Sequence, residues 1–191
     1  MKKNSVRAFI AIRIPPPVRE ETAALQAKLK RYALPIRWVP PDHMHLTLHF
    51  LGDLDRRRLT QAGKAMERAS AGCEAMTLAA KGLGTFPGVR RPRVIWCGFC
   101  GETDKLVHLH GGLGDELRQC GFTVERRPFR AHLTLGRVKN ALPADQLVAA
   151  IRTLGGFESE RFTVRTVHLY ESRLRPRGAL YISLGEAGLK R

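Results

Sequence analysis

His45-Leu46-Thr47-Leu48 is repeated as His132-Leu133-Thr134-Leu135, and this repetition gives the first indication of how the chain is organised. The two copies are 132 − 45 = 87 residues apart. The same shift carries Phe9-Ile10-Ala11-Ile12 onto Trp96-Cys97-Gly98-Phe99. Blocks that match in the same order indicate that one structural unit occurs twice in the chain.

A third block, Met76-Thr77-Leu78, matches Phe162-Thr163-Val164 one residue out of this register. Alternating apolar residues predict strands in both halves, over 6–14, 36–39, 45–51, 76–83, 93–99, 122–125, about 132–135, 162–170 and 179–184. Helical spacing predicts helices after the prolines 15–17 to about 32, and over 55–70, 103–120 and 144–153. The pattern predicts a single α+β domain over 1–191 with antiparallel sheets. It consists of two βαββαβ-like lobes, about 1–90 and about 91–191, related by a pseudo-twofold axis around a central cleft. Their terminal strands can be exchanged.

The charge of the chain points to a polyanionic partner. It has 33 Lys and Arg against 17 Asp and Glu, a formal net charge of +16. Nucleic acid is the commonest partner for such a balance. The longest apolar runs are far shorter than the roughly 20 residues that span a bilayer. No signal-peptide pattern is present, so a cytoplasmic protein without a membrane partner is expected. A self-contained duplicated core favours a monomer.

Each repeated tetrapeptide places two chemical groups on one face of a strand. Because side chains alternate, His45 and Thr47 point the same way, as do His132 and Thr134, while the leucines face the core. Two histidines, one neutral and one protonated, can supply a general base and a general acid to a cyclic phosphodiester. The two threonines, with Arg130 on the same face as His132, can hold the phosphate oxygens. No metal and no cofactor is expected.

Other interpretations of the histidines and cysteines stay open at this point. His43, His45 and His49 could share one face as metal ligands, which would make a metal-dependent phosphodiesterase. A module that binds RNA ends without turnover is the other alternative. His108 and His110 are expected to be solvent-exposed on a helix. The Cys97-Gly-Phe-Cys100 stretch lies in a strand pattern, so its cysteines, like Cys73 and Cys120, are expected in the core.

The sequence resembles the 2H phosphoesterases, and within them the RNA 2′,3′-cyclic phosphodiesterases, also called 2′-5′ RNA ligases. Two H-x-T-x motifs in duplicated lobes are the signature of that superfamily. The resemblance extends over nearly the whole chain, through the stretches 7–11, 37–41, 50–52, 82–87, 91–96, 127–130 and 172–174, with Gly178 and Tyr181. Ala131 stands where the family often has proline, which should matter little for the chemistry.

The resemblance implies an activity and roles for particular residues. The family opens 2′,3′-cyclic ends of RNA, such as tRNA fragments, or small cyclic nucleotides to 2′-phosphates, and can run the reaction backwards as ligation. His45 would be the general acid and His132 the general base. Arg137 would contact the phosphate or ribose, and Phe50 would stack on a base. An ideal strand turns Phe50 and Arg137 away from the histidines, so only a bulge or bend would bring them into the cleft.

Overall fold

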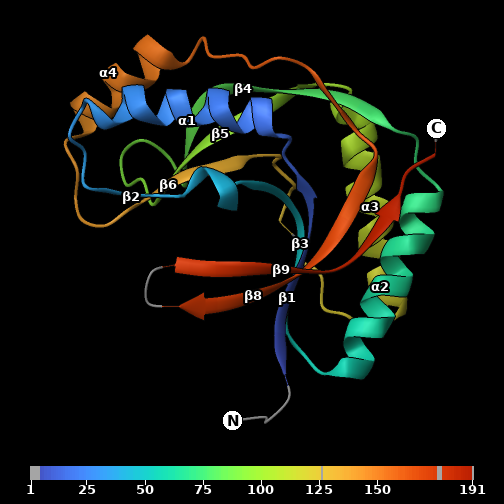
Figure 1. Ribbon diagram of the computed structural model, residues 1–191. Helices are drawn as coiled ribbons and strands as arrows, with labels where there is room; N and C mark the ends of the chain where they lie inside the picture. The colour runs from blue at the N-terminus through green and yellow to red at the C-terminus, as the bar shows by residue number, and fades with distance from the viewer. Residues whose placement is uncertain (1–4, 126, 176–177, 191) are drawn as a thin grey trace.

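The computed structural model describes residues 5–125, 127–175 and 178–190. Within these ranges the chain forms nine strands and four α-helices (Figure 1). The strands are β1 (Val6–Arg13), β2 (Ile36–Trp38), β3 (His45–Leu54), β4 (Met76–Phe86), β5 (Val94–Gly101), β6 (Leu133–Val138), β7 (Phe162–Val164), β8 (Thr166–Arg175) and β9 (Gly178–Gly188). The helices are α1 (Pro16–Lys30), α2 (Arg56–Ala71), α3 (Thr103–Gln119) and α4 (Ala144–Leu154), with a 3-10 turn η1 (Pro41–His43). No helix in the described part of the chain is long and apolar enough to cross a membrane.

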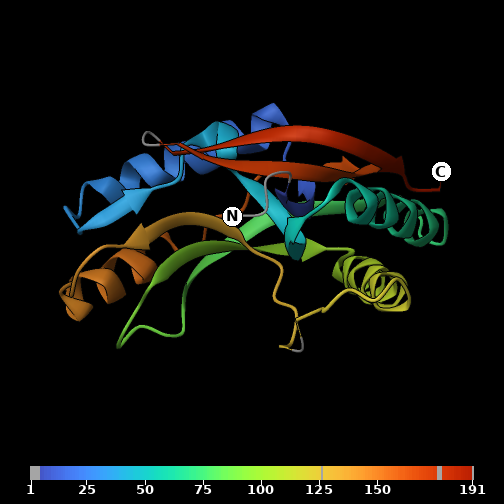
Figure 2. The ribbon, with the colours of Figure 1, turned by 90° about the horizontal axis from the view of Figure 1, so that it is seen from below.

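All nine strands belong to one antiparallel sheet, which confirms the predicted α+β class. The strand order is β7-β4-β5-β6-β3-β1-β8-β9, and β2 pairs with β6. The halves of the chain exchange strands, because β4 pairs with β5, whereas β8 and β9 from the C-terminal part lie beside β1. Figure 2 shows the result as two layers, with the red β8–β9 hairpin in one and the green and gold strands β4, β5 and β6 in the other. The central strands β3 and β6 carry the two repeated motifs.

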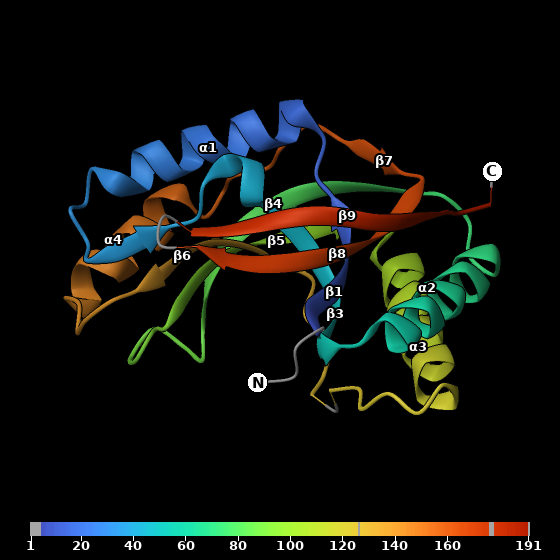
Figure 3. The same ribbon diagram turned by 60° about the horizontal axis from the view of Figure 1, so that its bottom comes forward.

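Local sequence signals explain where the helices begin. Pro16 and Pro17 occupy the first turn of α1, where the missing N–H of proline costs no hydrogen bond. The Asp55 side chain accepts a hydrogen bond of 2.8 Å from the Arg58 N–H and caps α2. Pro143 is the residue directly before the first residue of α4. The four helices lie within two residues of their predicted ranges, and α1 with α4 and α2 with α3 form pairs that join the two lobes (Figure 3).

Leucines from the two motifs fix the central strands to the core. Leu46, Leu133 and Leu135 are fully buried, and Leu48 is 5% exposed. Leu46 lies directly opposite Leu133, the one opposed pair that joins β3 to β6. Burying such a side chain stabilises the fold by roughly 1.5–3 kcal/mol. The same alternation that buries the leucines leaves the histidines and threonines on the concave side of the sheet.

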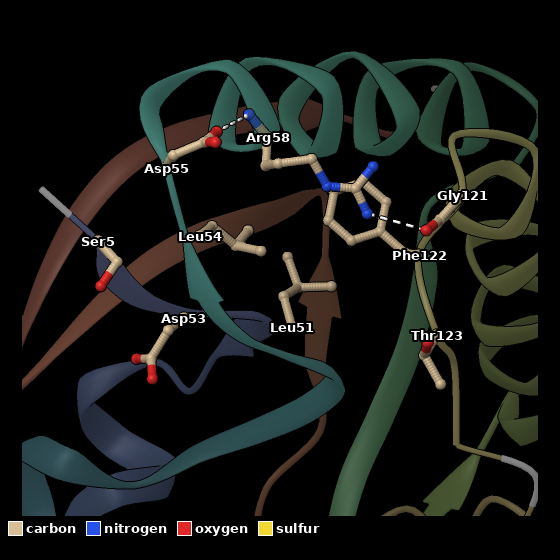
Figure 4. A pocket seen from close by; sticks show the side chains of 9 residues that line it. All are labelled: Ser5, Leu51, Asp53, Leu54, Asp55, Arg58, Gly121, Phe122 and Thr123. Atoms are coloured by element: carbon tan, nitrogen blue, oxygen red, sulfur yellow. Dashed lines mark hydrogen bonds between the residues drawn. The ribbon is translucent and has the colours of Figure 1, made fainter. Parts of the chain in front are cut away.

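Two strand predictions are wrong in detail. Residues 122–125 form no strand, and the predicted strand over 162–170 is divided into β7 and β8. Phe122 is instead fixed by packing, with the Arg58 guanidinium 3.7 Å above its ring. The same guanidinium donates to the carbonyl oxygens of Cys120 and Gly121, at 2.7 and 2.9 Å. Figure 4 shows this contact between α2 and the segment after α3. The contact lies in the wall of a cavity of about 450 Å³, and neither motif histidine lines that cavity.

Candidate active site

The pairing of β3 with β6 brings the two motifs together. With Leu46 opposite Leu133, the same register sets His45 beside Thr134 and Thr47 beside His132. The two histidines are then diagonal neighbours on one face of an antiparallel pair, a relation that places Cβ atoms about 7–8 Å apart or less. Each histidine is therefore accompanied by the threonine of the other motif. Both threonine side chains are half-buried, and neither hydroxyl is hydrogen-bonded to another described residue.

Both histidine rings are oriented by the same hydrogen bond. His45 Nδ1 lies 2.8 Å from the carbonyl oxygen of His43, and His132 Nδ1 lies 2.7 Å from that of Arg130. A carbonyl oxygen only accepts, so Nδ1 carries the hydrogen in both rings. The Nε2 atom of each ring is left to exchange a proton with a ligand in the cleft.

Aromatic rings flank each histidine. Phe9 lies 4.8 Å and Tyr181 5.0 Å from the His45 ring, measured between ring centroids. Phe86 and Trp96 lie 5.0 and 6.4 Å from the His132 ring. Sequence reasoning did not assign these rings to the site. The 87-residue repeat contained the signal, because it aligns Phe9 with Trp96.

A β-bulge follows each motif histidine at the same position. Ala11 pairs with Thr47 and Ile10 with His49, so Leu48 is the extra residue on β3. Trp96 pairs with Thr134 and Ile95 with Gly136, so Leu135 is the extra residue on β6. An extra residue reverses which side chains face the core beyond it.

The bulges bring Phe50 and Arg137 onto the histidine face. Phe50 is 64% exposed, and its ring lies 6.1 Å from that of Phe9, which contacts His45. The Arg137 side chain is exposed, and its charge helps to lower the pKa of His132. The same charge opposes the burial that raises the pKa of Tyr181. Arg130 contributes its carbonyl oxygen to the site, while its own side chain is exposed just before β6.

Both motif histidines are neutral at pH 7 in the free protein. Burial is the main cause, and it lowers the pKa of His45 from 6.5 to about 4, with the charges of His43 and His132 acting in the same direction. Burial and the charge of Arg137 lower the pKa of His132. In each ring the hydrogen bond to the backbone carbonyl opposes the shift.

The three histidines of the metal-site alternative do not come together, because the β3 bulge turns His49 into the core. His49 is 5% exposed and lies behind the strand, whereas His45 faces the cleft. Among the described residues no three His, Cys, Asp or Glu side chains cluster as ligands. His49 therefore does not share the face of His45, as the metal-site alternative requires.

His49 instead belongs to a stack of three rings. Its ring lies 4.2 Å from that of His110 at 20°, and His110 lies 4.0 Å from Phe129 at 13°. His49 Nε2 also lies 3.0 Å from the His110 carbonyl oxygen. His108 is exposed as predicted, but the prediction for His110 is wrong. The stack ties β3 and α3 to the residue next to Arg130, whose carbonyl orients His132.

The stack predicts a loss of stability in acid. Burial lowers the pKa of His49, and it lowers that of His110 to about 4, whereas an unfolded histidine titrates near 6.5. Between these values the unfolded chain binds protons that the folded chain does not, so the free energy of unfolding falls as the pH drops from 6.5 to 4. Urea unfolding should show a shallower fall for His110→Phe than for the wild type. His108→Phe on the same helix is the control, and an equal slope in all three proteins would contradict the prediction.

Gly84 provides the space that the Trp96 ring occupies beside His132. A Cβ atom at residue 84 would lie 2.2, 2.4 and 2.7 Å from three atoms of that ring. Gly84→Ala should therefore displace Trp96 and cost about 1–3 kcal/mol of stability, the usual range for overpacking. Urea unfolding followed by tryptophan fluorescence measures this cost. Gly88→Ala is the control, since nothing lies within 4 Å of its Cβ position, and equal stability of the two variants would refute the close approach.

The cysteines are not arranged for redox chemistry. Cys73 and Cys97 are buried as predicted, whereas Cys100 and Cys120 are only partly buried, contrary to prediction. Burial raises the pKa of Cys97 to about 12 and also raises that of Cys100. A reactive CxxC pair requires a lowered thiol pKa.

Comparison with known proteins agrees with this geometry. The RNA 2′,3′-cyclic phosphodiesterase of Thermotoga maritima is 33% identical over 181 residues, 95% of this chain and 94% of its own length. The enzyme of that name from Methanothermobacter thermautotrophicus is 31% identical over 94% of this chain and 96% of its own. The crystal structure of E. coli LigT complexed with 3′-AMP superposes with a TM-score of 0.77 at 25% identity, covering 98% of this chain and all of LigT.

The protein family described as "LigT like Phosphoesterase" matches this chain over residues 12–96 and 101–181, which include both histidine motifs. The match therefore extends over both lobes and both central strands. The chain belongs to the LigT-like phosphoesterase family of the 2H superfamily.

Proposed function

We propose that this protein hydrolyses the 2′,3′-cyclic phosphate ends of RNA to 2′-phosphate ends, with His45 and His132 as its acid–base pair. The observation that carries the proposal is the matched orientation of the two rings. Each Nδ1 is hydrogen-bonded to a backbone carbonyl oxygen. This leaves the two Nε2 atoms for proton transfer on one face of the central strands. The names of the relatives and the +16 net charge of the chain support RNA as the substrate.

The proposed step moves two protons in opposite directions. His132 Nε2 accepts a proton from water as the water oxygen attacks phosphorus. The bond from phosphorus to O3′ breaks, and O3′ receives the proton of His45 Nε2. The product has a 2′-phosphate and a free 3′-hydroxyl. With an RNA 5′-hydroxyl in place of water as the attacking group, the same step forms a 2′-5′ linkage.

The acid role of His45 requires help from the substrate. With a pKa of about 4, His45 is unprotonated in the free protein at pH 7. The negative charge of a bound phosphodiester raises the pKa of both histidines, so the protonated His45 forms within the complex. A substrate whose leaving group needs no proton distinguishes the two roles, for example a 3′-deoxynucleoside 2′-(4-nitrophenyl phosphate). Turnover of this ester should be restored in His45→Ala and not in His132→Ala, and the opposite pattern would exchange the roles.

The remaining residues of the site complete the proposal. Thr47 and Thr134 donate hydrogen bonds to the non-bridging oxygens, and Arg137 and Arg130 supply positive charge to the phosphate. Phe50, exposed on the histidine face, offers a platform on which the terminal base stacks. The protein is proposed to act as a monomer in the cytoplasm, on tRNA fragments, other RNA ends or small cyclic nucleotides.

The lowered pKa values predict an acidic optimum for kcat/KM. This parameter reports the free enzyme, which is active with one motif histidine protonated and the other neutral. Because both pKa values lie below 6.5, that form is most populated between about 4 and 6.5 and declines as the pH rises further. Initial rates at low substrate from pH 4 to 9, at constant ionic strength, measure the profile. A plateau that extends to pH 8 would contradict the lowered pKa values.

The proposal is tested with an RNA oligomer that ends in a 2′,3′-cyclic phosphate. The purified protein should convert this end to a 2′-phosphate, identified by mapping the products, and activity should persist in EDTA. Loss of activity in EDTA would indicate metal-assisted chemistry. Binding of the oligomer without turnover would show that the protein is an RNA-end-binding module.

A further inference from the structure

A cavity adjoins His45 on the side of β3 that faces away from β6 and His132. It has a volume of about 320 Å³ and extends from His45 across β1 and β8 to β9. The strand register shows its direction, since Arg13 pairs with His45, Ala11 with His168, and His168 with Glu186. Phe9, Arg13, His45, His168, Tyr170 and Glu186 are among the residues that line it. The two-histidine step makes no use of β8 or of the far end of β9.

Aromatic rings form a continuous path along this cavity. Phe9, next to His45, stacks on Tyr170 with centroids 5.4 Å apart at 24°. Tyr170 in turn lies 5.7 Å from His168. Phe9 is 3% and His168 is 9% exposed, so these two rings support Tyr170, whose half-buried ring is the one on which a base of single-stranded RNA can stack.

Polar groups of both signs border the far end of the cavity. His168 is 9% exposed and is held between Thr166 Oγ1, 3.2 Å from its Nε2, and a Glu186 carboxylate oxygen, 3.6 Å from its Nδ1. Glu186 remains 68% exposed and able to accept hydrogen bonds from base amino groups. The charge of exposed Arg13 acts on both His168 and Tyr170, so a guanidinium suited to phosphate also borders the cavity. Arg19 and Asp42, which also line the cavity, form an ion pair of 2.8 Å with each other. Arg13 and Glu186 thus remain as one cation and one carboxylate beside the rings, a combination that matches a nucleoside with its phosphate.

The corresponding place in the other lobe has different chemistry. The 87-residue shift that aligns the motifs replaces Arg13 with Cys100. There the Cys100 thiol lies 3.5 Å from a Glu158 carboxylate oxygen, and Glu158 forms an ion pair of 2.8 Å with Lys81. The catalytic pair is thus duplicated, while the features of the cavity beside His45 belong to one lobe. Because these features are not duplicated, they suit selection of the substrate rather than the acid–base step to which both lobes contribute.

We propose that this cavity binds the nucleoside that precedes the cyclic-phosphate nucleotide, so that the enzyme prefers an RNA chain of two or more nucleotides. The inference rests on the proposed function, in which the terminal base stacks on Phe50. A chain with a cyclic 3′ end continues only in the 5′ direction, so its second nucleoside needs a separate site. Tyr170 stacks on the second base, and Glu186 accepts a hydrogen bond from it.

The test compares a dinucleotide that ends in a 2′,3′-cyclic phosphate with the corresponding cyclic mononucleotide. The wild type should turn over the dinucleotide with a kcat/KM on the order of tenfold higher, as stacking of one base allows. Tyr170→Ala and Glu186→Ala should bring the ratio of the two kcat/KM values toward one, and Tyr170→Phe should preserve it. Glu158→Ala, which removes a carboxylate in the other lobe, is the matched control and should leave the ratio unchanged.

The outcomes separate this inference from the proposed function. If all variants keep the wild-type ratio, or if the wild type shows no preference, the cavity does not bind the second nucleoside, although the proposed hydrolysis stands. If the wild type turns over neither substrate, the proposed function fails. Calorimetric binding of the dinucleotide 2′-phosphate against the mononucleotide 2′-phosphate then decides the inference by itself. Glu186→Ala keeps this test valid even if Tyr170→Ala does not fold, because the Glu186 side chain is exposed.

Discussion

Alanine in place of His45 or of His132 is expected to lower kcat for cyclic phosphodiester hydrolysis by about 10²–10⁴-fold, the usual contribution of one positioned proton transfer. The reason lies in the matched geometry of the two rings. Each is oriented through Nδ1 by a backbone carbonyl, so that its Nε2 can serve as acid or base. Without one ring, water must take the place of a positioned acid or base, and the remaining histidine has no partner for the second proton transfer.

The measurement is single-turnover hydrolysis of an RNA oligomer with a cyclic end. The double variant should be little worse than either single variant, because residues that act in one step are not additive. His108→Ala, on the exposed side of α3, should keep wild-type rates. If His45→Ala or His132→Ala were less than tenfold slower than the wild type, with the fold intact, the two-histidine mechanism would be refuted.

Replacement of Thr47 or Thr134 by valine is expected to lower kcat by about 10²–10³-fold, as when one donor to a developing anion is removed. Valine keeps the β-branched shape and suits a strand, so the change removes a hydroxyl and little else. The register sets each threonine beside the histidine of the other motif, where its hydroxyl can follow the phosphate oxygens into the transition state.

The comparison of kcat with KM tests this role. Loss of a contact made chiefly in the transition state lowers kcat and leaves KM nearly unchanged. Thr163→Val, at an exposed position of β7, is the matched control and should behave as the wild type. An increase in KM alone would show that the hydroxyls bind the ground state and the transition state equally.

Much of the fold could be predicted because its signals are local. Helical spacing, together with the prolines 15–17 at the start of the first helix, predicts all four helices to within two residues. The predicted strand over 122–125 is absent, since Phe122 is fixed by the Arg58 guanidinium and by core contacts rather than by strand pairing. Contacts of that kind come from distant residues and leave no period in the sequence.

His110 illustrates the same limit at the site. Its spacing from His108 correctly puts the two side chains on different helix faces, but nothing in the spacing shows which face is covered. Tertiary packing sets His110 between His49 and Phe129, and thereby next to the backbone that orients His132. The position of His168 likewise follows only from the pairing of β8 with both β1 and β9, which sets His168 between Ala11 and Glu186.

The order of the residues is enough to predict that the chain contains one structural unit twice, that each unit presents a histidine and a threonine on one strand face, and that the fold is α+β. These conclusions follow from repetition and from the two-residue period of a strand, both of which can be read along the chain. The pairing between strands was needed to show that Phe50 and Arg137 lie on the histidine face of the sheet and that His49 lies in the core. Their orientation depends on the bulges at Leu48 and Leu135, and a bulge is a mismatch with a neighbouring strand that the sequence of one strand does not specify.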